Sequence, residues 1–62
     1  MAYEIHVDDA LRDVAKDTIT AVMCCNTYAK AGHDNVKAYR VNSDGTKEPY
    51  DWWQSYLELC YG

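Results

Sequence analysis

Carboxylates are the side chains of this sequence whose spacing could form a binding site. Asp9, Asp13 and Asp17 follow one another at intervals of four residues, and Asp8 precedes them. On a helix these side chains would lie along one side, with a rise of about 6 Å per step. Glu4 would approach the row from the preceding segment. Such a row can bind the Lys and Arg side chains of a basic protein site in place of nucleic-acid phosphates.

Two members of this row have a simpler explanation. Asp8 or Asp9 would cap the N-terminus of the helix, where acidic side chains also interact favourably with the helix dipole. Asp13 and Asp17 would lie beyond the first turn, and like charges four residues apart destabilise a helix by about 0.2–0.5 kcal/mol per pair. Asp13 and Asp17 are therefore the stronger candidates for binding a partner.

The sequence contains no arrangement typical of a metal site or a catalytic centre. The two histidines, His6 and His33, lack a second ligand at a familiar spacing. Cys24, Cys25 and Cys60 are an odd number with an adjacent pair, which is a poor disulfide framework, so we expect reduced thiols and a cytoplasmic protein. Without a nucleophile signature, a phosphate-binding loop or paired catalytic carboxylates, we expect neither an enzyme nor a cofactor or metal.

The C-terminal segment, DWWQSYLELCYG, is rich in aromatic residues and has helical periodicity. Asp51 and Gln54 have the spacing of a capping box. An apolar face with i, i+3, i+4, i+7 spacing is expected to pack in the core, and it comprises Trp53, Tyr56, Leu57 and Cys60. For Trp52, beside Asp51 and Glu48, two roles remain open: a place in the core, or an exposed anchor for a protein partner.

Hydrophobic patterning predicts the elements that would hold these side chains. Residues 2–7 alternate between apolar and polar, which is typical of a short strand. From Asp8 or Asp9, apolar residues recur at three- and four-residue steps and predict a helix of about six turns. This helix would end near Gly32, which suits the left-handed position after a helix C-terminus.

The rest of the chain predicts a hairpin and a final helix. Residues 35–41 alternate, Asp44-Gly45 is a turn signal, and residues 46–50 can form a short return strand. The predicted order is (β)αββα, in a single small α+β domain over residues 1–62, with a sheet of two or three antiparallel strands packed against two helices. An edge strand that ends at Pro49 could pair with a second copy, so we expect a monomer or a weak homodimer.

The overall charge narrows the choice of partners. Ten acidic residues against six basic residues give a formal net charge of −4, which argues against direct binding of nucleic acid or of an anionic membrane. The N-terminus lacks the features of a signal peptide, and no apolar run approaches the roughly 20 residues of a membrane span. The natural complement is a basic nucleic-acid-binding protein or complex.

In length, acidity and order of elements, the whole chain resembles the small phage-encoded anti-CRISPR proteins that act as DNA mimics on type I CRISPR surveillance complexes (Cascade). The resemblance involves no shared motif. It implies an inhibitor that evades host defence, with a row of carboxylates docked into a basic nucleic-acid groove of a host complex in the bacterial cytoplasm. The alternative is a protein-interaction module, such as a host-takeover or antitoxin-like factor, that contacts its partner through the aromatic C-terminal helix.

Overall fold

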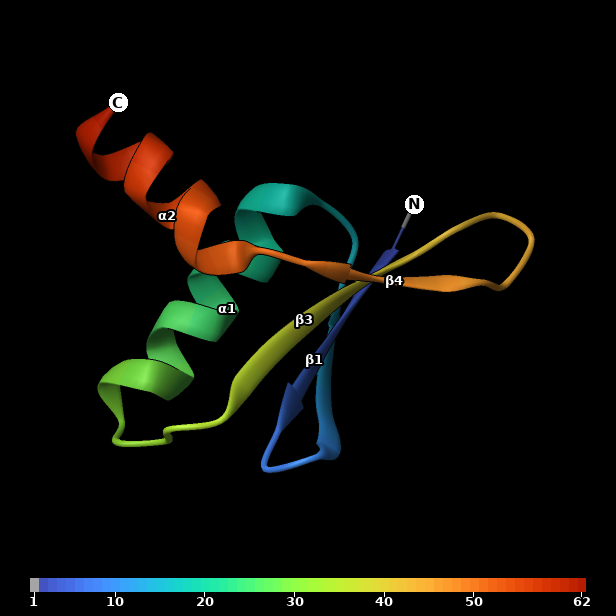
Figure 1. Cartoon of the computed structure of the whole chain (residues 1–62), viewed down its shortest axis with the longest axis horizontal. Helices are drawn as coiled ribbons and strands as arrows, with labels where there is room; N and C mark the ends of the chain where they lie inside the picture. Colours follow the sequence, from blue (N-terminus) through green and yellow to red (C-terminus); the bar gives the residue numbers. More distant parts are fainter. Residues whose placement is uncertain (1) are drawn as a thin grey trace.

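Four antiparallel strands form one sheet, and two helices lie on one side of it (Figure 1). The computed structural model describes residues 2–62. In chain order the elements are β1 (Ala2–Val7), β2 (Ala10–Ala15), α1 (Thr18–Lys30), β3 (Val36–Val41), β4 (Lys47–Tyr50) and α2 (Trp52–Tyr61). The strands lie in the order β2-β1-β3-β4. The prediction of a single α+β domain is confirmed, but the sheet has four strands and the order is ββαββα.

The first correction concerns the start of the predicted long helix. Asp8 and Asp9 form a two-residue loop between β1 and β2, and Val7 pairs with Ala10 across it. Both loop residues have positive φ, 54° for Asp8 and 65° for Asp9, as a type I′ hairpin turn requires. Aspartate tolerates this left-handed conformation better than most residues. The chain therefore turns back as a second strand, and the helix begins only at Thr18.

The prediction assumed that Leu11 and Val14, which have helical spacing, form part of a buried helix face. Neither side chain enters the core. Leu11 is opposite His6 and Val14 is opposite Glu4 in the β1–β2 ladder, so both lie on the face of the sheet that no helix covers. They are 53% and 56% exposed. A bulge between these pairs leaves Arg12 without a direct partner in the ladder.

The C-terminal end of helix α1 agrees with the prediction, but its N-cap is Asp17 and not Asp8 or Asp9. The Asp17 side chain accepts a hydrogen bond from the Thr20 N–H at 2.7 Å and caps the N-terminus. Lys30 lies in the last turn, and Gly32 has φ of 102° just beyond the helix, as a left-handed helix end requires. Cys25 and Val22 of this helix are fully buried.

The core lies between α1 and the covered face of the sheet. From β1 it takes the side chains that the alternation predicted, Tyr3, Ile5 and Val7. Three alanines contribute from the neighbouring elements, and the buried hydrophobic residues outside β1 are Ala15, Ala21, Val22, Cys25 and Ala38. With three alanines among its eight buried hydrophobic residues this core is small, and chains of about this length are often stabilised further by association.

The second hairpin and the final helix follow the prediction closely. β3 and β4 pair with Tyr39 opposite Pro49, and the turn between them contains Gly45 at φ of 89°. Asp51 caps α2 by accepting a hydrogen bond from the Gln54 N–H at 3.1 Å. Helix α2 packs mainly against α1 and continues beyond the sheet (Figure 1). Within residues 2–62, no helix is long and apolar enough to cross a membrane.

Candidate functional site

The row of carboxylates predicted on one helix face does not exist as a row. Asp8 and Asp9 lie at the tip of the first hairpin, Asp13 lies in β2, and Asp17 caps α1. Asp13 is opposite Ile5, so its side chain lies on the covered face of the sheet, beside α1. The prediction was wrong because it placed all four residues on a helix, where residues four apart are neighbours. On an extended strand, four residues span about 13 Å.

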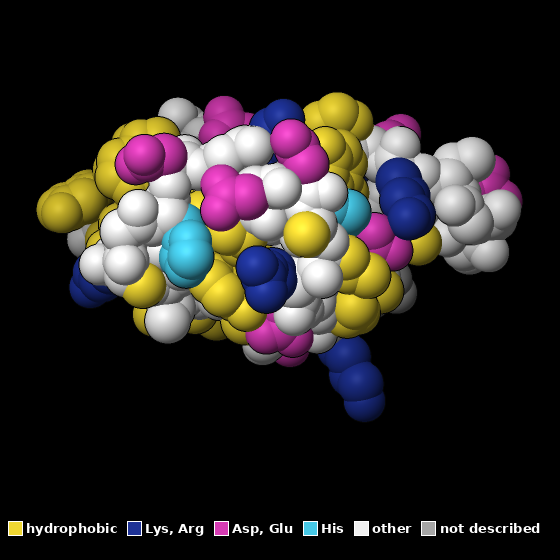
Figure 2. All heavy atoms as spheres, turned by 90° about the horizontal axis from the view of Figure 1, so that it is seen from below, with side chains coloured by type: hydrophobic (Ala, Val, Ile, Leu, Met, Phe, Trp, Pro, Cys, Tyr) yellow, Lys and Arg dark blue, Asp and Glu magenta, His cyan; other side chains and the backbone are white. Residues whose placement is uncertain are grey.

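Basic side chains lie close to the carboxylates at the hairpin tip. The nearest oxygen of Asp8 is 3.9 Å from Nδ1 of His33, and that of Asp9 is 4.0 Å from Nζ of Lys37. Figure 2, which views the molecule from below, shows acidic side chains as separate groups with basic and histidine side chains between them. This face is therefore of mixed charge.

Asp13 and Asp17 each have a local partner. The Asp13 carboxylate accepts a hydrogen bond from the backbone N–H of Val14 at 2.9 Å, and its other oxygen lies 3.9 Å from Sγ of Cys24. Burial, and then the neighbouring Asp13 charge, raise the pKa of the Cys24 thiol. The hydrogen bonds from Thr20 hold the pKa of Asp17 below its usual value. The two residues that the sequence favoured for binding thus have structural roles.

Glu4 belongs to a different cluster, on the uncovered face of the sheet. Its carboxylate lies 3.0 Å from Nε2 of His6 and 3.0 Å from Nζ of Lys47, and these hydrogen bonds lower the pKa of Glu4. The His6 ring packs edge-on against Tyr39, with 4.9 Å between the ring centroids. Glu4 therefore does not extend the Asp8–Asp9 tip.

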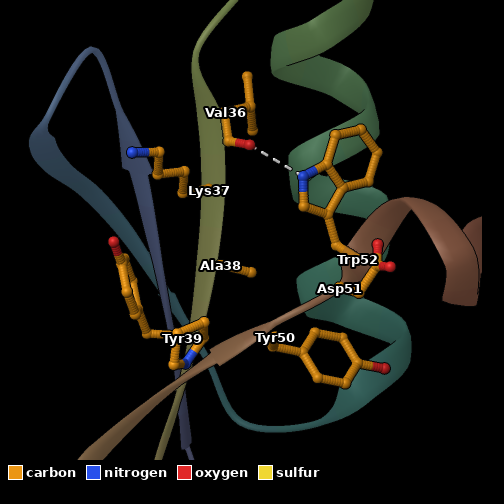
Figure 3. Close-up of a pocket in the computed structure, with 8 residues that line it drawn as sticks. Val36, Lys37, Ala38, Tyr39, Tyr50, Asp51 and Trp52 are labelled. Atoms are coloured by element: carbon orange, nitrogen blue, oxygen red, sulfur yellow. Dashed lines mark hydrogen bonds between the residues drawn. The ribbon is translucent and has the colours of Figure 1, made fainter.

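Of the two roles left open for Trp52, the structure shows the place against the core, whereas the core position predicted for Trp53 is wrong. The indole N–H of Trp52 donates to the carbonyl oxygen of Val36 at 3.0 Å (Figure 3), and the ring packs against the core. Trp53, which was expected in the core, is 52% exposed and stacks on Tyr56 at 5.6 Å. The prediction was wrong because α2 meets the body of the protein with the side that carries Trp52.

The hollow beside Trp52 has a volume of about 230 Å³ and lies where β3 and β4 lead into α2. Figure 3 shows Trp52 and Tyr50 on the helix side of the sheet, whereas Lys37 and Tyr39 point to its opposite side. The polar groups around the hollow therefore do not converge on one point. Glu48, which was expected near this helix start, forms an ion pair with Arg40 at 2.9 Å.

Helix α2 leaves an apolar surface open. None of its ten residues is buried, and helical spacing brings four apolar side chains within an arc of about 100°. We call these residues the α2 surface: Trp53, Leu57, Cys60 and Tyr61. Trp53 and Tyr61 are 52% and 80% exposed. The segment 48–62 carries three acidic side chains and no Lys or Arg, so the surroundings of the α2 surface are acidic.

A second apolar surface lies at the opposite edge of the sheet, and sequence reasoning did not find it. We call it the β2 edge surface, and it comprises Leu11, Val14, Ile19 and Met23, all about half exposed. A groove of about 510 Å³ runs beside it, lined by Asp13 of β2 and by residues of α1 that include Ile19 and Met23. Residues 10–15 do not alternate between apolar and polar, so the available signal for this strand was the Asp8-Asp9 pair, which can form a two-residue hairpin turn.

The thiols and histidines form no metal site within residues 2–62. The three cysteines are unpaired, and burial raises the pKa of Cys25 to about 12. Comparison with known protein families, with characterised proteins and with solved structures found no match to this chain.

Proposed function

We propose that this protein is a binding protein without catalytic activity, and that it docks through the α2 surface onto a basic face of a nucleic-acid-binding protein. One observation carries the proposal: an aromatic helix that is anchored by Trp52 yet has no buried residue. Isolated exposed apolar residues are common, but a periodic apolar face on a fixed helix is the form of helix that binds in a groove.

The surroundings of the α2 surface favour a basic partner. Glu48, Asp51 and Glu58 are the charged side chains of segment 48–62, and the whole chain has a net charge of −4. An arginine of the partner can stack on an exposed indole and also pair with a nearby carboxylate. Nucleic-acid-binding proteins present such basic faces.

Occupation of that face would exclude the nucleic acid. The protein would then inhibit its partner in the host bacterial cytoplasm, in the manner of the anti-CRISPR proteins that it resembles. In this proposal the inhibition comes from a docked helix and does not require imitation of a phosphate backbone.

Photo-crosslinking tests this proposal. A benzophenone amino acid at position 53 would label the partner, and the same group at position 14, which is equally exposed on another face, is the matched control. We expect position 53 alone to label a basic nucleic-acid-binding protein. With that protein purified, the wild type should weaken its DNA or RNA binding at least about tenfold, and Trp53→Ala should not. An acidic partner, or equal inhibition by Trp53→Ala, would refute the proposal.

A second candidate is the DNA mimic, and the distribution of four carboxylates favours it. Asp8 and Asp9 lie at one end of β2, Asp13 within it and Asp17 just beyond it, so four carboxylates lie along one edge of the sheet, although not in a continuous row, with Arg12 and Lys16 in the same segment. Charge can be removed here without damage to local structure. Asn-Gly suits the type I′ turn at positions 8 and 9, and serine can replace Asp17 as a cap.

The triple variant Asp8→Asn, Asp9→Gly and Asp17→Ser therefore distinguishes the two candidates. A DNA mimic would lose most of its inhibition in this variant, and its binding would weaken steeply with salt. Docking through the α2 surface predicts inhibition within about threefold of the wild type, since these positions lie outside that surface.

A further inference from the structure

We propose that the free edge of β2 pairs with β2 of a second copy of this chain, which would join two four-stranded sheets into one of eight strands. The starting observation is that β2 is an edge strand of six residues, and an unpaired edge is a template for another strand. Apolar side chains are exposed on both sides of this edge. An occupant that covers both sides must bring a strand and a helix together, as a second copy does.

The sequence of β2 is complementary to itself when it is reversed. In an antiparallel pair centred between Arg12 and Asp13, Arg12 lies opposite Asp13 of the second copy, and Asp13 opposite its Arg12. Leu11 then lies opposite Val14, and Ala10 opposite Ala15. Each charged residue meets the opposite charge, and each apolar residue meets an apolar residue, as favourable cross-strand pairs require.

The bulge at Arg12 makes this register possible. Residues directly opposite each other in a ladder must lie on the same face of the sheet, and residues three apart normally lie on opposite faces. Here Leu11 and Val14 share the uncovered face, because the bulge shifts the register between Ile5 and His6. Ala10 and Ala15, opposite Val7 and Tyr3, share the covered face. A two-fold axis perpendicular to the sheet would therefore match the apolar pairs on both faces, and the proposal places Arg12, which the bulge leaves without a partner in β1, across from Asp13 of the second copy.

The backbone at this edge has a donor ready for a new partner. The N–H of Val14 donates to the Asp13 carboxylate at 2.9 Å, so it is not used in the pairing with β1. On dimer formation this N–H would donate to the carbonyl oxygen of Leu11 in the second copy. The Asp13 carboxylate would then be free to accept a hydrogen bond from Arg12 of that copy. The hydrogen bond between Val14 and Asp13 within one chain would thus be replaced by two hydrogen bonds between the copies.

Helix α1 would contribute to the same interface on the covered face. Ile19 and Met23 are 62% and 49% exposed and lie beside Asp13 in the groove next to β2. A perpendicular two-fold axis would bring the α1 helices of the two copies to either side of the strand pair. The contact would comprise one strand of six residues and two side chains of α1 from each copy, and because small interfaces bind weakly we expect a weak, reversible dimer.

Analytical ultracentrifugation between about 10 μM and about 1 mM tests the proposal, because a dimer with a small interface should dissociate within this range. The wild type should change from the mass of the monomer to about twice that mass. Arg12→Asp places two carboxylates opposite each other in the new strand pair, and Asp13→Arg places two guanidinium groups opposite each other. Each single variant should therefore dimerise at least about tenfold more weakly. Lys30→Glu reverses a charge away from the edge and should dimerise like the wild type.

The decisive measurement mixes the two single variants. The β2 strand of Arg12→Asp has two adjacent acidic side chains, and that of Asp13→Arg has two adjacent basic side chains, so an equimolar mixture should form a heterodimer. The double variant Arg12→Asp, Asp13→Arg should recover the homodimer. A wild type that stays monomeric at the highest concentration, single variants that dimerise like the wild type, or a mixture that stays monomeric would each overturn the proposal.

Discussion

Replacement of the two adjacent tryptophans tests which side of α2 meets the body of the protein. Trp52→Ala removes a ring that packs against the core and an indole N–H that donates to Val36 at 3.0 Å. Trp53→Ala removes a ring that is already 52% exposed. The residues are neighbours of the same type in the same helix, so differences in helix propensity cancel between the two variants.

The expected magnitudes follow from burial. A fully buried aromatic ring removes about 150–250 Å² from water, worth at most about 4–6 kcal/mol at about 25 cal/mol per Å². Trp52 is only partly buried, and the unfolded chain already hides some of this area, so we expect Trp52→Ala to lower the free energy of unfolding by about 3 kcal/mol. For Trp53→Ala we expect about 1 kcal/mol.

Thermal unfolding followed by far-UV circular dichroism measures the difference. A domain of this size has a total stability of about 3–9 kcal/mol, so Trp52→Ala should leave a marginally folded protein. The difference of about 2 kcal/mol between the variants corresponds to about 8–16 °C in melting temperature. Trp52→Phe, which keeps most of the ring, should fall between them. A Trp53→Ala variant that melts as low as Trp52→Ala would refute this arrangement of α2.

Three further predictions concern individual side chains. Asp17→Ala should lower the melting temperature, whereas Asp17→Ser, which keeps a capping side chain, should not. Because the pKa of Asp17 is lowered in the folded protein, the stabilisation by its carboxylate is present at neutral pH and is lost as the pH falls through that lowered pKa. The melting temperatures of the wild type and Asp17→Ala should therefore converge in acid. Asp9→Gly should raise the melting temperature by about 4 °C, since glycine adopts the observed φ of 65° without strain; a lower melting temperature would contradict the turn assignment. Mass spectrometry of alkylated protein at mildly alkaline pH should find Cys60 modified first, Cys24 more slowly and Cys25 only on unfolding, and early modification of Cys25 would contradict its burial.

Predictions from the sequence were correct for features that depend only on residues close together in the chain. The alternation of residues 2–7 predicted which side chains of β1 enter the core, and Asp51 caps α2 as its spacing with Gln54 predicted. The turn at Gly45 and the left-handed conformation at Gly32 were also confirmed. Each of these depends on backbone conformations or hydrogen bonds within a few residues.

Tertiary structure decided the elements whose local pattern allowed two interpretations. Residues 10–15 have apolar spacing that suits a helix, yet they form β2, because the open edge of β1 requires hydrogen-bond partners and the Asp8-Asp9 turn supplies a neighbouring strand. Because residues 8–17 do not form a helix, the four aspartates predicted to form one charged row are distributed over a turn, a strand and a helix cap.

Hydrophobic periodicity likewise could not predict which face of α2 packs against the rest of the protein. The apolar face with Trp53 has the better helical spacing, but α2 packs through Trp52, whose N–H reaches an acceptor in β3. Periodicity measures which side chains share a helix face, whereas the docking of a helix depends on the shape and hydrogen-bonding groups of the surface it meets. The sequence therefore determined the caps, the turns and the core face of β1. The packed structure determined which aromatic face stays exposed and which strand edge stays open.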